Sequence, residues 1–119
     1  MLFSRRGHGR VTVTEAHRAV QEGTALLLDV READEWQAGH APGACHLPLS
    51  RLAAGADVPG AGTAATVVVI CRSGRRSQAA VRLLSQRGHD ATDVVGGMER
   101  WTRQGLPVQD DRGGVGTVI

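Results

Sequence analysis

The stretch TVVVICRSGRRSQAAVRLLSQRG, residues 66–88, decides the fold. Its first five residues, Thr66 to Ile70, are a run of mostly β-branched side chains, which is typical of a strand. From Ser77 to Arg87 apolar and polar residues separate at helical spacing, which predicts a surface helix packed on a core. Gly88 is the predicted end of that helix.

The same alternation of strands and helices continues on both sides of this stretch. Upstream, Thr14 is the predicted N-cap of a helix that Gly23 ends. The other predicted elements are a buried strand over 26–30, a helix over 32–37 ended by Gly39, a short strand over 44–47, a helical turn over 49–54, a strand over 93–95 and a helix over 98–104. This pattern predicts a single α/β domain with a central parallel sheet flanked by helices on both faces, a three-layer fold.

Composition limits the chain to one domain with one core. The 119 residues include 41% hydrophobic and 22% charged side chains, which excludes wholesale disorder. We predict a flexible basic lead-in over 1–10, a domain over 11–109 and a loose tail over 110–119. Residues 115–119 either pair with a sheet edge or remain disordered.

All 14 basic residues are arginines, and the net charge is only +2. A net charge this small does not indicate a nucleic-acid partner. We expect Arg5, Arg6 and Arg10 to be solvated. Cys45 and Cys71 are too few and too far apart for a disulfide framework or a zinc site. The sequence has no signal peptide and no run long enough to span a bilayer, so we expect a cytoplasmic protein with no membrane partner.

The chemistry is predicted to lie in the Cys71 loop, which we define as residues 71–77. This loop joins the carboxyl end of a strand to a helix, where an α/β sheet binds ligands. Backbone N–H groups, the helix dipole and Arg72, Arg75 and Arg76 would stabilise a thiolate over a thiol, which makes Cys71 the predicted nucleophile. Gly74 permits the backbone conformation of such a cradle.

Four motifs in register resemble the rhodanese family across residues 11–108. They are Leu28-Asp29-Val30-Arg31; Glu35-Trp36 with Gly39-His40-Ala41-Pro42-Gly43-Ala44; the Cys71 loop; and Gly96-Gly97-Met98 with Trp101 and Gly105-Leu106-Pro107. Two positions depart from the family pattern: His46 stands where Asn is usual, and Trp36 replaces the commoner Tyr. We expect a local rearrangement at His46.

The resemblance implies a sulfurtransferase that needs neither a metal nor an organic cofactor. Cys71 would accept a sulfane sulfur from thiosulfate or a similar small anionic donor, and a thiophilic acceptor, such as cyanide or a small or protein thiol, would remove it. Arg72 would attract the donor, and the rest of the substrate site would be Ser73, Gly74, Arg75, Arg76 and Ser77. The alternative is a partner-binding or sulfur-relay module with little turnover on small donors.

Loop length separates this chain from the related phosphatases, which place five residues between cysteine and arginine. Here the sixth position after Cys71 is Ser77, and Arg76 comes one position earlier. The shorter cradle fits a sulfur atom better than a phosphoryl group. We therefore expect sulfur transfer rather than phosphatase activity.

Several other residues could have either a functional or a structural role. Asp29 and Arg31 either support the site from behind or form a structural ion pair, and we favour the ion pair. Cys45 is either a resolving thiol or, as we favour, a buried packing residue. His40 is predicted to be a hydrogen-bonded turn residue rather than a general base. Trp36 and Trp101 are predicted to pack in and around the core.

Overall fold

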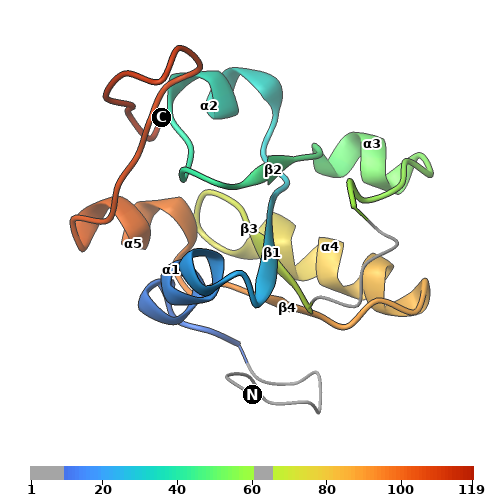
Figure 1. Cartoon of the computed structure of the whole chain (residues 1–119). Coiled ribbons are helices and arrows are strands. Elements are labelled where there is room, and N and C mark those ends of the chain that lie inside the picture. The colour runs from blue at the N-terminus through green and yellow to red at the C-terminus, as the bar shows by residue number, and fades with distance from the viewer. Residues whose placement is uncertain (1–9, 61–65) are drawn as a thin grey trace.

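A computed structural model describes residues 10–60 and 66–119 of the chain. The described strands form one parallel sheet in the order β2-β1-β3-β4 (Figure 1). They are β1, Ala25–Asp29; β2, Cys45–His46; β3, Thr66–Ile70; and β4, Ala91–Asp93. The predictions for Arg5 and Arg6 concern residues outside the described ranges.

Helices cover both faces of this sheet (Figure 1). Helices α1, Val13–Glu22, and α5, Gly97–Arg103, pack on one face, and α3, Leu49–Ala53, and α4, Arg75–Gln86, pack on the other. Helix α2, Ala33–Ala38, has no buried residue and belongs to neither hydrophobic cluster. The sheet divides the single predicted core into two hydrophobic clusters, one on each face, and alternate residues of β3 enter them. Val69 belongs to the cluster with Leu84 of α4, whereas Val68 belongs to the cluster with Trp101 of α5. The predicted three-layer α/β fold is confirmed. No helix of the described ranges is long and apolar enough to cross a membrane.

Two helix starts differ from the sequence-based prediction. The N-cap of α1 is Thr12 rather than Thr14, because Thr12 and Glu15 form a reciprocal capping box. Helix α4 begins at Arg75 rather than Ser77, directly after Gly74. The earlier start places the helix N-terminus, with its unpaired N–H groups, closer to Cys71.

Strand β4 also lies two residues earlier than predicted, because the residues after Asp93 pair with the segment around Val11 instead of continuing the pairing with β3. Val11 forms a parallel bridge beside Val94: its N–H donates to the Asp93 carbonyl oxygen at 2.9 Å, and its own oxygen accepts from Val95 at 2.8 Å. This pairing carries Arg10 to the carboxyl end of β4. Arg10 is 38% exposed, as expected of a solvated residue, but its pairing with Asp93 shows that the expectation of a flexible lead-in is wrong at this position.

The expectation of a loose tail is wrong as well. Gln109 pairs in antiparallel fashion with both His40 and Val115, and the Thr117 N–H donates to the Ala38 carbonyl oxygen at 2.8 Å. The tail therefore runs beside α2 (Figure 1) rather than along a sheet edge, and Val118 packs against the core on the α1–α5 face. Its backbone groups find hydrogen-bond partners on a distant segment, which the local Gly-rich sequence does not reveal.

Candidate active site

Three parallel strands bring their carboxyl ends together at Cys71. The register pairs Ile70 of β3 with Asp29 of β1, and Val69 with Asp93 of β4. Cys71 follows β3 directly and is only 1% exposed. Since successive parallel strands end at one edge of the sheet, a carboxylate from each neighbouring strand lies close to the cysteine.

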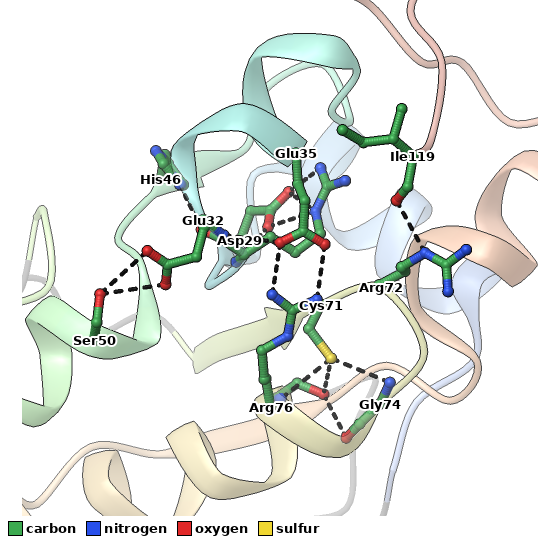
Figure 2. A network of polar contacts seen from close by, with 12 residues as sticks. Asp29, Glu32, Glu35, His46, Ser50, Cys71, Arg72, Gly74, Arg76 and Ile119 are labelled. Atoms are coloured by element: carbon green, nitrogen blue, oxygen red, sulfur yellow. Dashed lines mark hydrogen bonds and ion pairs between the residues drawn. The ribbon is translucent and has the colours of Figure 1, made fainter.

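The Cys71 sulfur lies in a small cradle built by its own loop (Figure 2). Sγ accepts hydrogen bonds from the backbone N–H of Gly74 at 3.1 Å and of Ser77 at 3.3 Å, and the thiol donates to the Ser77 hydroxyl at 3.4 Å. Gly74 has φ +133°, a conformation that strains any residue with a side chain. Two converging amides at a helix N-terminus favour negative charge on the sulfur.

Helix α5 fixes the back of the loop. The Met98 N–H donates to the Cys71 carbonyl oxygen at 2.8 Å, and the Glu99 N–H donates to the Arg72 carbonyl oxygen at 3.0 Å. Gly97 makes this approach possible, because a Cβ there would meet the Cys71 oxygen at 2.4 Å. The Gly96-Gly97 motif therefore holds the backbone of Cys71 in place.

The arginines of the loop are not equivalent. Arg76 makes a bidentate pair with Glu35 of α2, at 2.6 and 2.8 Å, and Arg72 pairs with Glu99 at 2.8 Å. Arg72 also donates from Nε to the main-chain oxygen of Ile119 at 2.9 Å (Figure 2). Within the described chain, exposed Arg75 has no ion pair or hydrogen-bond partner for its guanidinium. Glutamates thus offset two of the three predicted positive charges.

The Glu35–Arg76 ion pair links α2 to the Cys71 loop and changes the pKa of both side chains. The hydrogen bond from Arg76 lowers the pKa of Glu35 despite its partial burial, and the same bond raises the pKa of Arg76. A carboxylate whose pKa is lower in the folded state stabilises the fold above its unfolded pKa. That stabilisation is lost as the pH falls through the folded value.

Replacing Glu35 with glutamine should therefore reduce the acid sensitivity of the fold. We expect the free energy of unfolding of wild type to fall more steeply than that of Glu35→Gln as the pH drops below about 4.3, the ordinary value for a glutamate. Urea unfolding at a series of pH values measures both slopes. Asp34→Asn, an exposed carboxylate on the same helix, is the control. Parallel slopes for wild type and Glu35→Gln would contradict the coupling.

Asp29 and Arg31 form a fully buried ion pair behind the site. Arg31 Nη2 donates to Asp29 Oδ2 at 2.7 Å and to the Gly39 carbonyl oxygen at 2.7 Å, and both side chains are 0% exposed. Arg31 Nη1 is buried without a hydrogen-bond partner in the described structure. This geometry agrees with the structural ion pair favoured from the sequence, and the pair ties the end of β1 to the segment after α2.

The rings of Trp36, His40 and His46 form a stack on the α2–β2 side. The His40 ring lies 3.6 Å from Trp36 and the His46 ring 4.7 Å from it, both nearly parallel. His40 Nδ1 donates to the Trp36 carbonyl oxygen and His46 Nε2 to that of Arg31, each at 2.7 Å. His40 is thus a hydrogen-bonded turn residue, as predicted. The departure at His46 is accommodated by stacking.

The predicted burial of Trp101 agrees with the structure, whereas that of Cys45 agrees only in part. Trp101 is fully buried and donates from Nε1 to the Pro107 carbonyl oxygen at 2.8 Å, which confirms a core position. Cys45 is half-buried rather than buried, because β2 is the edge strand of the sheet.

Two charged residues near the sulfur were missed by the sequence reasoning. Asp93 Oδ2 accepts a hydrogen bond from the Ser77 hydroxyl at 3.2 Å, and Arg10 holds the same carboxylate through two bonds of 2.9 Å. The sequence pattern places Asp93 in a predicted strand, and only the rule that parallel strands end at one edge of the sheet marks it as a neighbour of Cys71. Arg10 carries no local signal, because its partner lies 83 residues away.

Comparison with known proteins agrees with this geometry. The rhodanese-like domain model matches residues 12–104. A rhodanese-related protein from Thermoplasma volcanium is 30% identical, with a TM-score of 0.72 over 85% of this chain and 97% of that one. Two further solved structures share the fold. A rhodanese-like domain protein from Staphylococcus aureus is 24% identical, with a TM-score of 0.68 over 91% of this chain and 98% of that one. A possible tyrosine phosphatase from Rhodopseudomonas palustris is 22% identical, with a TM-score of 0.75 over 84% of this chain and 83% of that one.

The fold and the cysteine cradle define an α/β domain of the sulfurtransferase or sulfur-relay type. The chain belongs to the rhodanese-like domain family.

Proposed function

We propose that this protein is a sulfurtransferase that carries sulfane sulfur on Cys71. The observation that carries the proposal is the cradle, in which the N–H groups of Gly74 and Ser77 both point at Sγ. Such donors stabilise an anionic sulfur, whether it is the thiolate before transfer or the persulfide after it. A buried cysteine that only filled the core would have no use for them.

The proposed reaction has two displacements. The Cys71 thiolate attacks the outer sulfur of thiosulfate, a sulfur–sulfur bond forms to Cys71, and sulfite leaves with the electron pair of the bond that breaks. A cyanide or thiolate acceptor then attacks the terminal sulfur of the persulfide. The Cys71 thiolate is regenerated, and thiocyanate or a new persulfide leaves. In each step the nucleophile supplies the electron pair of the new bond and the leaving group keeps the pair of the broken bond, so no electrons are gained or lost and no redox partner is needed.

Mass spectrometry of the intact protein tests this proposal. Incubation with thiosulfate should add about 32 Da, one sulfur atom, and later addition of cyanide should remove it and release thiocyanate. Cys45→Ser is the control and should gain the same mass. No adduct with thiosulfate, but an adduct after mixing with a persulfidated protein, would replace the proposal with a relay module. No adduct from either donor would overturn sulfur transfer altogether.

Positive charge at the rim is proposed to collect the anionic donor. Arg75 is the loop arginine with no carboxylate partner in the described chain, so Arg75→Ala should raise the KM for thiosulfate several-fold and leave kcat nearly unchanged. Arg72→Ala should act in the same direction, because it leaves Glu99 unpaired at the rim. Both effects should shrink as the salt concentration rises.

Arg82→Ala is the matched control for these variants. Arg82 is an exposed arginine of the same helix, about two turns further along α4 from Arg75. Steady-state kinetics at low and high salt should show little change in this variant. An equal KM for wild type, Arg75→Ala and Arg72→Ala would contradict a role for these arginines in donor binding.

A further inference from the structure

The Ser77 hydroxyl is placed among three acceptors, although it has a single proton to donate. The Gly74 carbonyl oxygen lies at 3.0 Å, Asp93 Oδ2 at 3.2 Å and Cys71 Sγ at 3.4 Å. A hydroxyl that donates to Asp93 or Gly74 presents only lone pairs to the sulfur and can accept a hydrogen bond from a thiol. A hydroxyl that donates to the sulfur stabilises a thiolate instead.

Asp93 makes the first arrangement favourable. Its side chain is 6% exposed, so its carboxylate is a strong acceptor in a site with little water to screen its charge. It also places a negative charge one hydroxyl group away from the sulfur. Both effects oppose ionisation of Cys71 and so act against the two amides of the cradle.

Arg10 offsets this carboxylate. Its guanidinium binds both oxygens of Asp93 at 2.9 Å, and that bond raises the pKa of Arg10. Nη2 lies only 3.2 Å from the point where a Cβ of Gly74 would stand, so the guanidinium contacts the cradle itself. Arg10 is therefore a cation beside the sulfur, brought there by the bridge between Val11 and Val94.

We propose that Asp93 and Arg10 are positioning residues that act through the Ser77 hydroxyl to set the balance between thiol and thiolate at Cys71. Asp93 directs the hydroxyl proton away from the sulfur and favours the thiol, and Arg10 limits this effect by neutralising the carboxylate. The role rests on the proposed function in that the same balance decides how readily Cys71 attacks a donor.

Other charged groups surround Cys71, and none of them contacts the Ser77 hydroxyl. From the remaining elements these groups are Asp29 and Arg31 at the end of β1, Glu35 of α2, Arg72, Arg75 and Arg76 of the Cys71 loop, and Glu99 of α5. All of them except Arg75 are paired with a partner from this set. Among the described residues, Asp93 is the one carboxylate hydrogen-bonded to the hydroxyl that bonds the sulfur.

Alkylation of Cys71 by iodoacetamide tests the proposal without any sulfur donor. The rate follows the thiolate fraction, and a Cys45→Ser background leaves Cys71 as the one thiol in the sequence. Asp93→Asn should move the midpoint of the pH–rate profile down and raise the rate at neutral pH by about threefold to tenfold. Arg10→Gln should do the opposite by a similar factor, and Arg10→Lys should restore most of the wild-type rate.

Opposite shifts from the two partners of one ion pair are the decisive result. A merely structural ion pair would loosen the cradle in both variants and move both rates in the same direction, and that result, or no shift in either, would overturn the proposal. Asp90→Asn, at the other end of β4, is the charge control. Arg10 is 38% exposed, so its variants decide the question where Asp93→Asn does not fold. A lower rate in Arg10→Gln that Arg10→Lys restores would then support the proposal, and an unchanged or higher rate in Arg10→Gln would overturn it.

The outcome is independent of the persulfide experiment. Opposite alkylation shifts in a protein that gains no sulfur from any donor would uphold the role of Asp93 and overturn the proposed function. A sulfur adduct in a protein whose alkylation rate ignores both variants would do the reverse.

Discussion

Cys71→Ser is expected to abolish the sulfur adduct and to lower thiocyanate formation by at least about a thousandfold. A serine hydroxyl is not ionised at neutral pH and does not form a persulfide, so the first displacement has no nucleophile. The cradle itself should persist, since an oxygen can accept the hydrogen bonds that Gly74 and Ser77 donate. Mass spectrometry after incubation with thiosulfate and a thiocyanate assay measure the loss.

The stability of Cys71→Ser decides how this result is interpreted. A melting temperature close to that of wild type shows that lost activity comes from lost chemistry rather than unfolding. Residual transfer at the wild-type rate would contradict a persulfide on Cys71. Transfer that also vanishes in Cys45→Ser would make the half-buried second thiol a participant.

Asp29→Asn is expected to destabilise the fold by about 3–5 kcal/mol, because it leaves the buried Arg31 guanidinium without its counter-charge. Domains of this size are stable by only about 5–15 kcal/mol, so the loss is a large fraction of the whole. The Arg31 side chain donates three hydrogen bonds to the Asp29 carboxylate, and no solvent reaches either residue. Urea unfolding at neutral pH measures the change.

A double variant makes this prediction sharper. Asp29→Asn combined with Arg31→Met removes both charges and should recover part of the loss, since an apolar residue of similar length replaces the buried cation. The exposed Asp34→Asn should change the stability by less than about 0.5 kcal/mol. A loss of that small size in Asp29→Asn would mean that other groups already compensate Arg31.

The sequence was informative where structure depends on neighbours in the chain. Strand β3 has the predicted bounds, because its β-branched run has no polar interruption between residues 66 and 70. The cradle around Cys71 was also predictable, since the loop's own amides build it. The ends of helices were less predictable than the strand. Helix α4 starts two residues before the predicted Ser77, because Gly74, with its positive φ, already turns the chain into the helix.

Contacts that join distant segments could not be predicted from the sequence. Arg76 meets Glu35 across 41 residues, Arg72 meets Ile119 across 47, and Arg10 meets Asp93 across 83. Nothing in the local pattern of an arginine tells which carboxylate it will face. Three clustered arginines therefore indicated more positive charge at the sulfur than the folded chain leaves unpaired.

The bridge of Val11 beside β4 and the folded-back tail have a practical consequence for how this domain is cut out for study. The region that the family shares spans residues 12–104, and both Arg10 and the Ile119 oxygen that receives Arg72 lie beyond it. An expression clone trimmed to the shared region would keep Cys71 and the two amides of its cradle. It would lose Arg10, which lies beside the sulfur, and the hydrogen-bond partner of Arg72, so measurements on it would describe a site with a different rim.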